Sequence, residues 1–191
     1  MTDAAPTDPT APDRRAPDRR TGEMLRVDHA GEHGAVAIYR GQRAVFERLP
    51  HKARMTGLLA EMEAGEQHHL AEFDRLLTER RVRPTALAPL WQAAGWGLGV
   101  ATALMGERAA MACTSAVESV IEGHYGDQAD ELDARGQSPE LSDTFRRFRE
   151  DELGHHDTAI KEGAEDAPGY RLMSHVIRAG CHAAIRVSQK V

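Results

Sequence analysis

The feature of this sequence that most limits its possible folds is a spacing of glutamates and histidines that occurs twice. In each occurrence a glutamate lies 34 residues before a Glu-x-x-His motif, and the second occurrence follows the first at a shift of 86 residues. The six residues are Glu32, Glu66, His69, Glu118, Glu152 and His155. On an α-helix, positions i and i+3 share a face, so each motif presents a carboxylate and an imidazole together. The spacing suits a helical hairpin that carries one glutamate midway along each leg, roughly 25 Å from the turn.

Two such hairpins packed face to face bring all six side chains to one depth of a four-helix bundle. This is the ligand set of carboxylate-bridged di-iron bundles, in which two helices give one glutamate each and two helices give Glu-x-x-His. Four buried carboxylates are costly unless they are compensated, and two Fe²⁺ ions carry the balancing positive charge. Imidazole and carboxylate ligands suit iron or manganese, and no thiolate stands among them to favour zinc. The pattern therefore predicts two carboxylate-bridged Fe²⁺ ions held by these six residues.

Composition and turn signals favour an all-α fold. Aromatic residues make up only 5% of the chain, and β-branched residues are sparse beside Ala, Leu, Glu and Arg, which favours helix over strand. No hairpin-type turn separates alternating apolar runs. Proline and glycine signals, including the Ser138-Pro139 start signal, divide the chain into helical segments at about 22–49, 51–83, 86–105, 107–134, 139–163 and 168–191. Four of these form the predicted bundle, the third is an apolar crossover helix, and the sixth is a C-terminal helix.

The N-terminal residues 1–20 are predicted to be a disordered tail rich in Pro, Asp and Arg, followed by one helical domain at 21–191. The tail holds four prolines and repeats APDRR in tandem, and it has too little apolar surface to offset the entropy of ordering. It lacks the apolar core of a secretory signal, and its aspartates argue against a mitochondrial presequence.

Charge and cysteine content limit the partners and the compartment. The net charge of −6 disfavours a nucleic-acid partner. Two cysteines, Cys113 and Cys181, are too few for a disulfide scaffold, and we expect them to be reduced thiols inside the cell.

Several titratable residues lie close to the six in sequence. The histidines that adjoin them point about 100° away on a helix and are excluded as ligands; these are His33, His68 and His156. Two glutamates one turn away remain open as alternative ligands or supporting residues, namely Glu63 and Glu122. A metal-bound imidazole normally needs an acceptor for its second nitrogen, and this role is open to Asp28 and Asp157.

The connection between the two hairpins is unusually apolar. Residues 84–106 contain no charged residue and include Trp91 and Trp96. The length is compatible with a transmembrane helix, but a single crossing would put the two hairpins on opposite sides of the bilayer. We therefore expect this segment to lie in the membrane interface with its tryptophans at headgroup level. A buried crossover helix or a dimer interface remains the alternative.

The glycine run in the apolar connection and the charge pattern of the last segment also bear on function. The Gly95-x-Gly97-x-Gly99 run lacks the spacing and the preceding strand of a dinucleotide site. The last segment carries only basic charges after Asp166 and places its arginines and its apolar residues on different faces. Such a helix is compatible with an anionic membrane surface, or with simple packing on the bundle.

At these residues the sequence resembles the demethoxyubiquinone hydroxylase family, the di-iron monooxygenases of ubiquinone biosynthesis. The matching stretches are RVDHAGEHGAVAIYRGQ from Arg26, EQHHLAEFDRLL from Glu66, RVRPTALAPLW from Arg81, MACTSAVESVIEGHY from Met111 and FREDELGHHD from Phe148. The resemblance covers the chain from about Gly22 onward. Ser119 stands where the family often has a second glutamate.

The resemblance implies a ferritin-like fold, iron at the six residues above, and hydroxylation by O₂ of the one open ring carbon of a polyprenylated methoxy-methyl-benzoquinol. The implied partners are this membrane-dissolved quinol, O₂, a membrane surface and an electron donor that the sequence does not identify, while a homo-oligomer stays open. His124 and Tyr125 match a His-Tyr pair on the family's substrate side. They are candidates for substrate contact or electron transfer, or else a packed tyrosine and a satisfied histidine. The implied location is the cytoplasmic side of the cell membrane, as a peripheral protein.

Two other classes of function remain open at this point. The same ligand set serves iron storage or peroxide detoxification on a ferritin-like bundle, although the apolar segment 84–106 suits a storage cage poorly. A helical interaction module without metal is the third possibility, and it predicts no bound iron.

Overall fold

The computed structural model describes residues 18–190, and within this range the chain forms helices and no strand. The long helices are α1 (Arg19–Phe46), α2 (Ala53–Glu79), α3 (Ala88–Leu104), α4 (Glu107–Ala134), α5 (Pro139–Lys161) and α6 (Tyr170–Ser188), with short 3₁₀ turns at Pro50–Lys52 and Ala164–Asp166. The all-α prediction is confirmed, and the helix ends differ from the predicted ones by a few residues at most.

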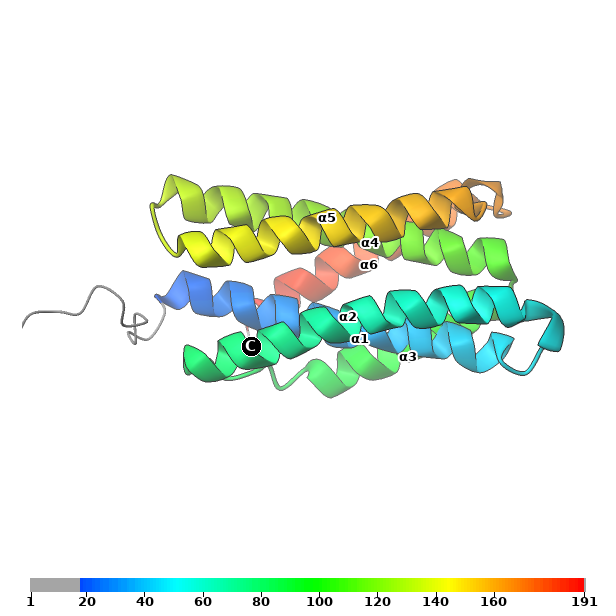
Figure 1. Cartoon of the computed structure of the whole chain (residues 1–191), viewed down its shortest axis with the longest axis horizontal. Helices are drawn as coiled ribbons and strands as arrows, with labels where there is room; N and C mark the ends of the chain where they lie inside the picture. Colours follow the sequence, from blue (N-terminus) through cyan, green and yellow to red (C-terminus); the bar gives the residue numbers. More distant parts are fainter. Residues whose placement is uncertain (1–17, 191) are drawn as a thin grey trace, which may run out of the picture.

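Helices α1, α2, α4 and α5 form an antiparallel four-helix bundle, as predicted (Figure 1). The turn between α1 and α2 lies at one end of the bundle, and the turn between α4 and α5 lies at the other (Figure 1). Outside the bundle, α3 packs along α1, and α6 packs mainly on α4. The expected crossover helix and C-terminal helix are therefore both present.

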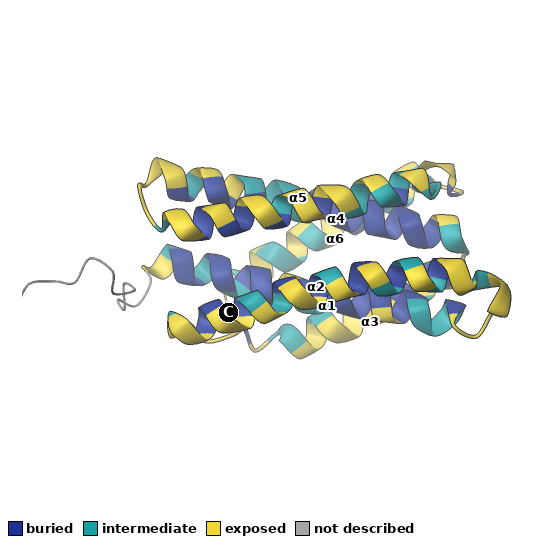
Figure 2. Cartoon of the chain, viewed as in Figure 1, coloured by how far each residue is buried: buried dark blue, intermediate teal, exposed yellow. Residues whose placement is uncertain are grey.

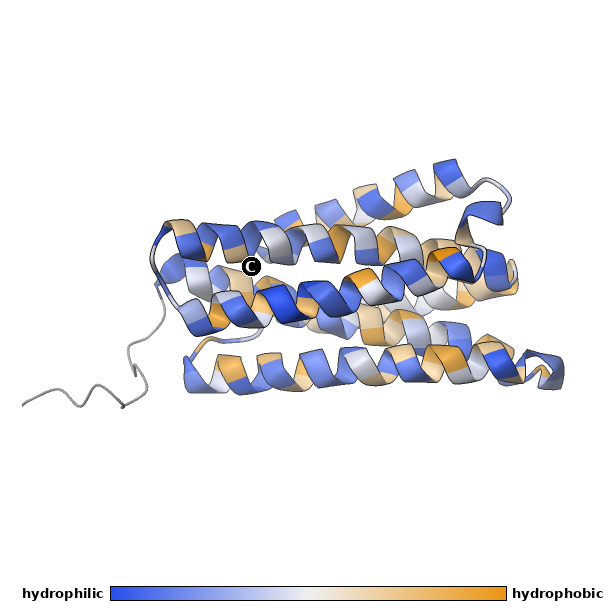
Figure 3. Ribbon diagram, turned by 45° about the horizontal axis from the view of Figure 1, so that its top comes forward, coloured by the Kyte–Doolittle hydropathy of each residue, from blue (hydrophilic) through white to orange (hydrophobic). Residues whose placement is uncertain are grey.

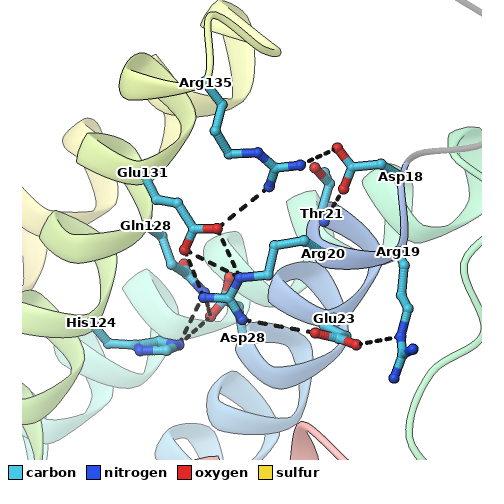
Figure 4. Close-up of polar contacts among 10 residues, drawn as sticks. All are labelled: Asp18, Arg19, Arg20, Thr21, Glu23, Asp28, His124, Gln128, Glu131 and Arg135. Carbon is cyan, nitrogen blue, oxygen red and sulfur yellow. Dashed lines mark hydrogen bonds and ion pairs between the residues drawn. The ribbon is translucent and has the colours of Figure 1, made fainter.

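The start of α1 is fixed to the end of α4 by a group of charged residues (Figure 4). Asp18 caps the helix by accepting a hydrogen bond from the backbone N–H of Thr21 at 2.9 Å. Arg20 binds Glu131 through two nitrogens, and Arg135 donates to Asp18 at 2.6 Å. The helix thus begins at Arg19, inside the range assigned to the tail, because these side chains give its first turn partners. Residues 1–17 of that range lie outside the described part of the chain.

The start of α5 differs in detail from its sequence signal. Pro139 is the first helical residue, as expected. Ser138 adopts a left-handed conformation with a φ of 45°, and its hydroxyl makes no capping bond. Instead, this hydroxyl accepts a hydrogen bond from Arg80 at 3.1 Å, so it joins the end of α2 to the start of α5.

The described residues form three buried apolar clusters, of which two lie within the bundle, one toward each end. One of these two includes Tyr39 and Phe46, and the other includes Phe73 and Tyr125. The third lies where α6 packs on α1 and α4, around Ile177. Buried residues follow the inner face of each bundle helix (Figure 2), and hydrophobic and hydrophilic bands alternate along the helices, as expected for amphipathic helices (Figure 3). The sequence positions between the two clusters within the bundle carry the predicted metal ligands.

Helices α1 and α3 touch backbone to backbone at glycines. A Cβ atom on Gly95 would overlap the carbonyl oxygen of Gly34, and a Cβ atom on Gly99 would overlap that of Ile38. Gly97, between them, faces open space. The glycine run that fails as a dinucleotide motif is therefore a small-x-x-x-small packing surface of the kind that lets two helices approach closely.

The opposite face of α3 is apolar and exposed. Leu90, Trp96 and Leu104 have exposed fractions of 55%, 51% and 71%. Trp91 instead turns toward α6 and donates a hydrogen bond from its indole to Ser188 at 3.0 Å. None of the helices in the described part of the chain combines the length and the apolar character that a membrane crossing requires.

Candidate metal centre

The bundle brings the six predicted residues together at its middle. Their donor atoms fall into two groups, in each of which one ligand atom per residue lies within 4.8 Å of the others. The first group contains Glu32, Glu66, His69 and Glu152, and the second contains Glu66, Glu118, Glu152 and His155. Glu66 and Glu152 belong to both groups, so their carboxylates lie between two potential metal positions.

The hydrogen bonding of these six residues shows whether they fit a pair of metal ions. Eight buried polar atoms of these residues have no hydrogen-bond partner among the described residues. They are Oε2 of Glu32 and Glu118, both carboxylate oxygens of Glu66 and of Glu152, and Nδ1 of His69 and His155. Buried polar groups in native proteins are almost always satisfied, so a cluster of unpaired donor atoms that face one another fits bound cations. The residues present therefore fit two metal ions.

Two tyrosines hold the glutamates that are not shared. Tyr39 on α1 donates to Glu118 Oε1 at 2.6 Å, and Tyr125 on α4 donates to Glu32 Oε1. Burial raises the pKa of both phenols well above its usual value, so both remain donors at neutral pH. Each phenol occupies one carboxylate oxygen and leaves the other oxygen facing the centre.

The histidines present Nδ1 to the centre. His69 Nδ1 lies 3.1 Å from Glu152 Oε1, and His155 Nδ1 lies 2.8 Å from Glu66 Oε1. Neither of these two nitrogen–oxygen contacts has hydrogen-bond geometry. This is expected if the nitrogen and the oxygen both point at a common metal position instead of at each other. On its other side, His69 Nε2 bonds to Asp151 at 3.1 Å.

The electrostatics of the cluster reflect four carboxylates in a desolvated space. Burial raises the pKa of Glu32 and Glu118 well above the usual range, and the neighbouring carboxylates raise it further. Burial lowers the pKa of His69 and His155, but the surrounding carboxylates outweigh it and raise the values to about 12 and about 11. Burial also raises the pKa of Glu66, yet the two histidines lower it to about 2. In the absence of metal, the imidazoles therefore stay protonated at neutral pH, and the two unshared glutamates hold their protons to a higher pH than an ordinary carboxyl group does.

We expect metal loading to release protons. Both imidazoles are protonated on both nitrogens at neutral pH. Nδ1 must lose its proton before it can bind a cation. Because protons and metal compete for these atoms, apparent metal affinity should rise with pH across the neutral range. Calorimetric titration of Mn²⁺ into the full chain, in buffers of different ionisation enthalpy between about pH 6.5 and 8, measures the proton count. An affinity that does not change with pH would contradict this assignment of protons.

Other residues considered from the sequence face away from the centre. Glu63 accepts hydrogen bonds from Arg40 and Arg43, and Glu122 accepts one from Arg149. These arginines satisfy both glutamates, so neither joins the two groups of donor atoms. The supporting role left open for Asp157 finds no contact in the structure, since this exposed carboxylate lies 3.5 Å from His156 rather than beside His69 or His155.

His124 and Asp28 form a separate polar pair between α4 and α1 (Figure 4). Asp28 Oδ1 lies 3.3 Å from His124 Nε2 and accepts a hydrogen bond from Gln128 at 3.1 Å. Burial raises the pKa of Asp28, despite the partial compensation by His124. Of the roles that the sequence leaves open, Asp28 thus takes one beside His124 rather than beside His69 or His155.

An apolar cavity of about 380 Å³ lies on the side of the bundle covered by α3 and α6. Helices α1, α3, α4 and α6 line it, and its walls include Gly31 and Val117, which directly precede Glu32 and Glu118. The lining is almost wholly aliphatic apart from Trp91. Its size and apolar character are typical of small-molecule binding sites.

The sequence reading missed two residues that contact the ligands. Tyr39 is related to Tyr125 by the same shift of 86 residues as the glutamates, and this signal would have identified it. Asp151 directly precedes Glu152, but its contact is with His69 on another helix. Adjacency in sequence therefore gave no indication of its partner.

Comparison with known proteins gives consistent matches. A sequence profile of the family described as "Ubiquinone biosynthesis protein COQ7" matches residues 19–188. The "3-demethoxyubiquinol 3-hydroxylase" of Rhodospirillum rubrum is 51% identical over 168 residues, or 88% of this chain and 77% of that protein. The human "NADPH-dependent 3-demethoxyubiquinone 3-hydroxylase, mitochondrial" is 42% identical over 88% of this chain and 76% of that protein. The "5-demethoxyubiquinone hydroxylase, mitochondrial" of Saccharomyces cerevisiae is 41% identical over 88% of this chain and 77% of that protein.

The profile match runs from the first residue of α1 to the last residue of α6. It therefore includes the whole bundle, both additional helices and all six residues of the candidate centre. The chain belongs to the COQ7 family of ubiquinone biosynthesis proteins.

Proposed function

We propose that this chain is a di-iron monooxygenase that hydroxylates the ring of demethoxyubiquinol, a polyprenyl methoxy-methyl-benzoquinol, with O₂. The observation that carries the proposal is the buried set of eight unpaired donor atoms at the middle of the bundle. It supplies a binding site for two cations in a chain whose relatives are named as demethoxyubiquinol or demethoxyubiquinone hydroxylases.

In this proposal, Glu32 and His69 would hold one iron, Glu118 and His155 would hold the other, and Glu66 and Glu152, which belong to both groups of donor atoms, would serve both. Carboxylate and imidazole ligands without a thiolate favour iron over zinc. When bound, the two irons supply the redox chemistry by which O₂ reacts with the ring. One oxygen atom replaces a ring hydrogen as a hydroxyl group, and the other leaves as water with two electrons and two protons from a donor.

The residues of the chain contribute binding and orientation. Tyr39 and Tyr125 fix the unshared glutamates, so each free oxygen keeps its direction toward the centre. The aliphatic cavity beside Gly31 and Val117 accepts the quinol ring and the start of its prenyl tail, and it excludes water. Several relatives are named as NADPH-dependent, and we propose NADPH as the source of the electrons here.

A direct test is hydroxylation of a short-chain demethoxyubiquinol by the full chain after anaerobic loading with Fe²⁺. With ¹⁸O₂ and a reductant, the product should carry one labelled oxygen, detected by mass spectrometry. Label taken from water, or no product from a protein that holds two irons, would overturn the proposal. Continued uptake of iron beyond two ions per chain would indicate storage instead.

We further propose that the exposed face of α3 attaches the protein to the membrane that holds its substrate. Leu90, Trp96 and Leu104 present aliphatic and indole groups to solvent, and amphipathic surfaces of this kind lie at the headgroup boundary. The same helix lines the cavity with its other face. A quinol could therefore pass from the bilayer to the cavity along α3 without crossing water.

We expect the double variant Trp96→Glu and Leu104→Glu to lose membrane binding. Two charges placed in the interface oppose insertion, and they replace two exposed apolar groups. Flotation with vesicles of mixed zwitterionic and anionic lipid measures the bound fraction, which should fall at least about tenfold. Ala71→Glu, at an exposed position of α2, is the matched control and should float like the unmodified chain. Equal flotation of all three proteins would reject the interfacial position of α3.

A further inference from the structure

The two halves of the candidate metal centre are related by a shift of 86 residues, so each residue in one half can be compared with its counterpart in the other. Tyr39 and Tyr125 obey this relation, and each donates to the unshared glutamate of the other half. The two groups of donor atoms also obey it, since each consists of three carboxylates and one imidazole. A departure from this symmetry therefore identifies what distinguishes the two metal positions.

The symmetry breaks at the residue before each Glu-x-x-His motif, which is Gly65 in the first half and Asp151 in the second. Asp151 accepts a hydrogen bond from His69 Nε2 at 3.1 Å. Gly65 has no side chain to offer His155, and a Cβ atom there would lie 3.2 Å from His155 Nε2. Within residues 18–190, no side chain makes a hydrogen bond to that nitrogen of His155.

The surroundings of the two imidazoles differ in the same direction. His69 stacks on Phe148 with ring centroids 4.0 Å apart, and its side chain is 1% exposed. The residue that corresponds to Phe148 in the first half is Met62, which has no ring to stack on His155. The side chain of His155 is 17% exposed.

These differences have a direct consequence for metal binding. An acceptor on the outer nitrogen keeps the proton at Nε2, directs the Nδ1 lone pair toward the metal and strengthens the imidazole as a ligand. A ring already held by stacking also loses less freedom when it binds. His69 has both advantages, whereas His155 lacks the outer acceptor and makes only a T-shaped contact with Tyr39, at a centroid distance of 6.2 Å.

We propose that the two metal positions are unequal, that the position completed by His69 fills first and holds its ion more tightly, and that Asp151 is the positioning residue responsible. The position completed by His155 fills second and exchanges its ion more readily. This inference rests on the ligand set of the proposed function, but not on the reaction catalysed.

The test is an anaerobic titration of the full-length, metal-free protein with Mn²⁺, followed by calorimetry and electron paramagnetic resonance. We expect two binding steps whose affinities differ at least about tenfold, as loss of an outer hydrogen bond to a ligand typically produces. At one equivalent the spectrum should be that of an isolated Mn²⁺ ion. At two equivalents it should become that of an exchange-coupled pair.

Variants assign the steps to the two histidines. Asp151→Ala should weaken the first step by about 10-fold to 100-fold, which brings the two steps together, and Asp151→Asn, which retains an acceptor oxygen, should restore part of the difference. Glu150→Ala removes the same charge from an exposed position next to it and should leave both steps unchanged.

A second pair of variants probes the other position. Gly65→Ala pushes against the ring of His155 and should change only the second step. Gly57→Ala, on the same helix with open space around its Cβ position, is its control.

The outcomes separate the inference from the proposed function. Two equal steps in the unmodified protein, or an effect of Asp151→Ala on the second step alone or on neither step, would overturn the inference. Failure to bind Mn²⁺ at all would overturn both the inference and the proposed ligand set. Unequal steps in a protein that, loaded with iron, does not hydroxylate the quinol would sustain the inference and overturn the proposed reaction.

Discussion

Glu152→Ala should abolish hydroxylation and prevent loading of the metal pair, while the helical fold persists. Glu152 belongs to both groups of donor atoms, with one oxygen 3.1 Å from His69 Nδ1 and the other 3.3 Å from His155 Nδ1. Its removal therefore takes a donor from both metal positions. Since loss of an outer hydrogen bond alone costs up to about 100-fold in metal affinity, loss of a bridging carboxylate should cost more.

The same substitution should lower the stability of the metal-free protein without unfolding it. It takes a carboxylate away from two buried, protonated imidazoles and leaves a small cavity, and both changes are unfavourable. Circular dichroism should show unchanged helix content and a lower melting temperature, while metal analysis shows fewer than one ion per chain. Glu150→Ala, two residues away and exposed, should retain both metal and activity. Full turnover by the Glu152→Ala protein would contradict the proposal that Glu152 serves both metal positions.

Gly99→Ala should produce the second large effect, on stability rather than chemistry. The added Cβ would overlap the carbonyl oxygen of Ile38, and a backbone atom cannot move aside as a flexible side chain does. Overpacking of this kind costs about 1–3 kcal/mol, and we expect the upper end of that range. For a chain of this length, that corresponds to a fall in melting temperature of about 6–12 °C.

Gly97→Ala provides the matched control two residues away. Its Cβ meets open space, and alanine is the better helix former by about 1 kcal/mol. The two substitutions should therefore shift the melting temperature in opposite directions, as measured by thermal unfolding. A stabilised Gly99→Ala protein would show that α1 and α3 are not in backbone contact.

That the six side chains come together was predictable from the sequence, because the prediction needs only the regular geometry of an α-helix. With the known rise per residue of an α-helix, the interval of 34 residues places two glutamates at the same depth on the two legs of a hairpin. Its repetition after 86 residues predicts a second hairpin with its side chains at that depth. No contact between helices had to be known to derive the group. The all-α class followed for the same reason, since it depends on local preference and periodicity.

Contacts between helices were less predictable. Asp28 lies one turn before Glu32 and still faces His124, because the rotation of α1 against α4 depends on packing along its whole length. Glu63 is a reasonable candidate ligand by its sequence position, but Arg40 and Arg43 of the neighbouring helix bind its carboxylate in the structure. The sequence shows that the glycines of α3 do not form a dinucleotide-binding motif, but it does not show that they pack against α1. That role depends on how closely the backbone of α1 approaches them.

The position of the centre along the helices has a consequence for its dynamics. Each ligand lies near the middle of a long helix, and the two inter-helix turns lie at opposite ends of the bundle. Fraying begins at helix ends and reaches only the outer turns in ordinary local opening. Backbone amides near Glu66 and Glu152 should consequently be among the slowest to exchange with deuterated solvent, even when both ends of the molecule open freely.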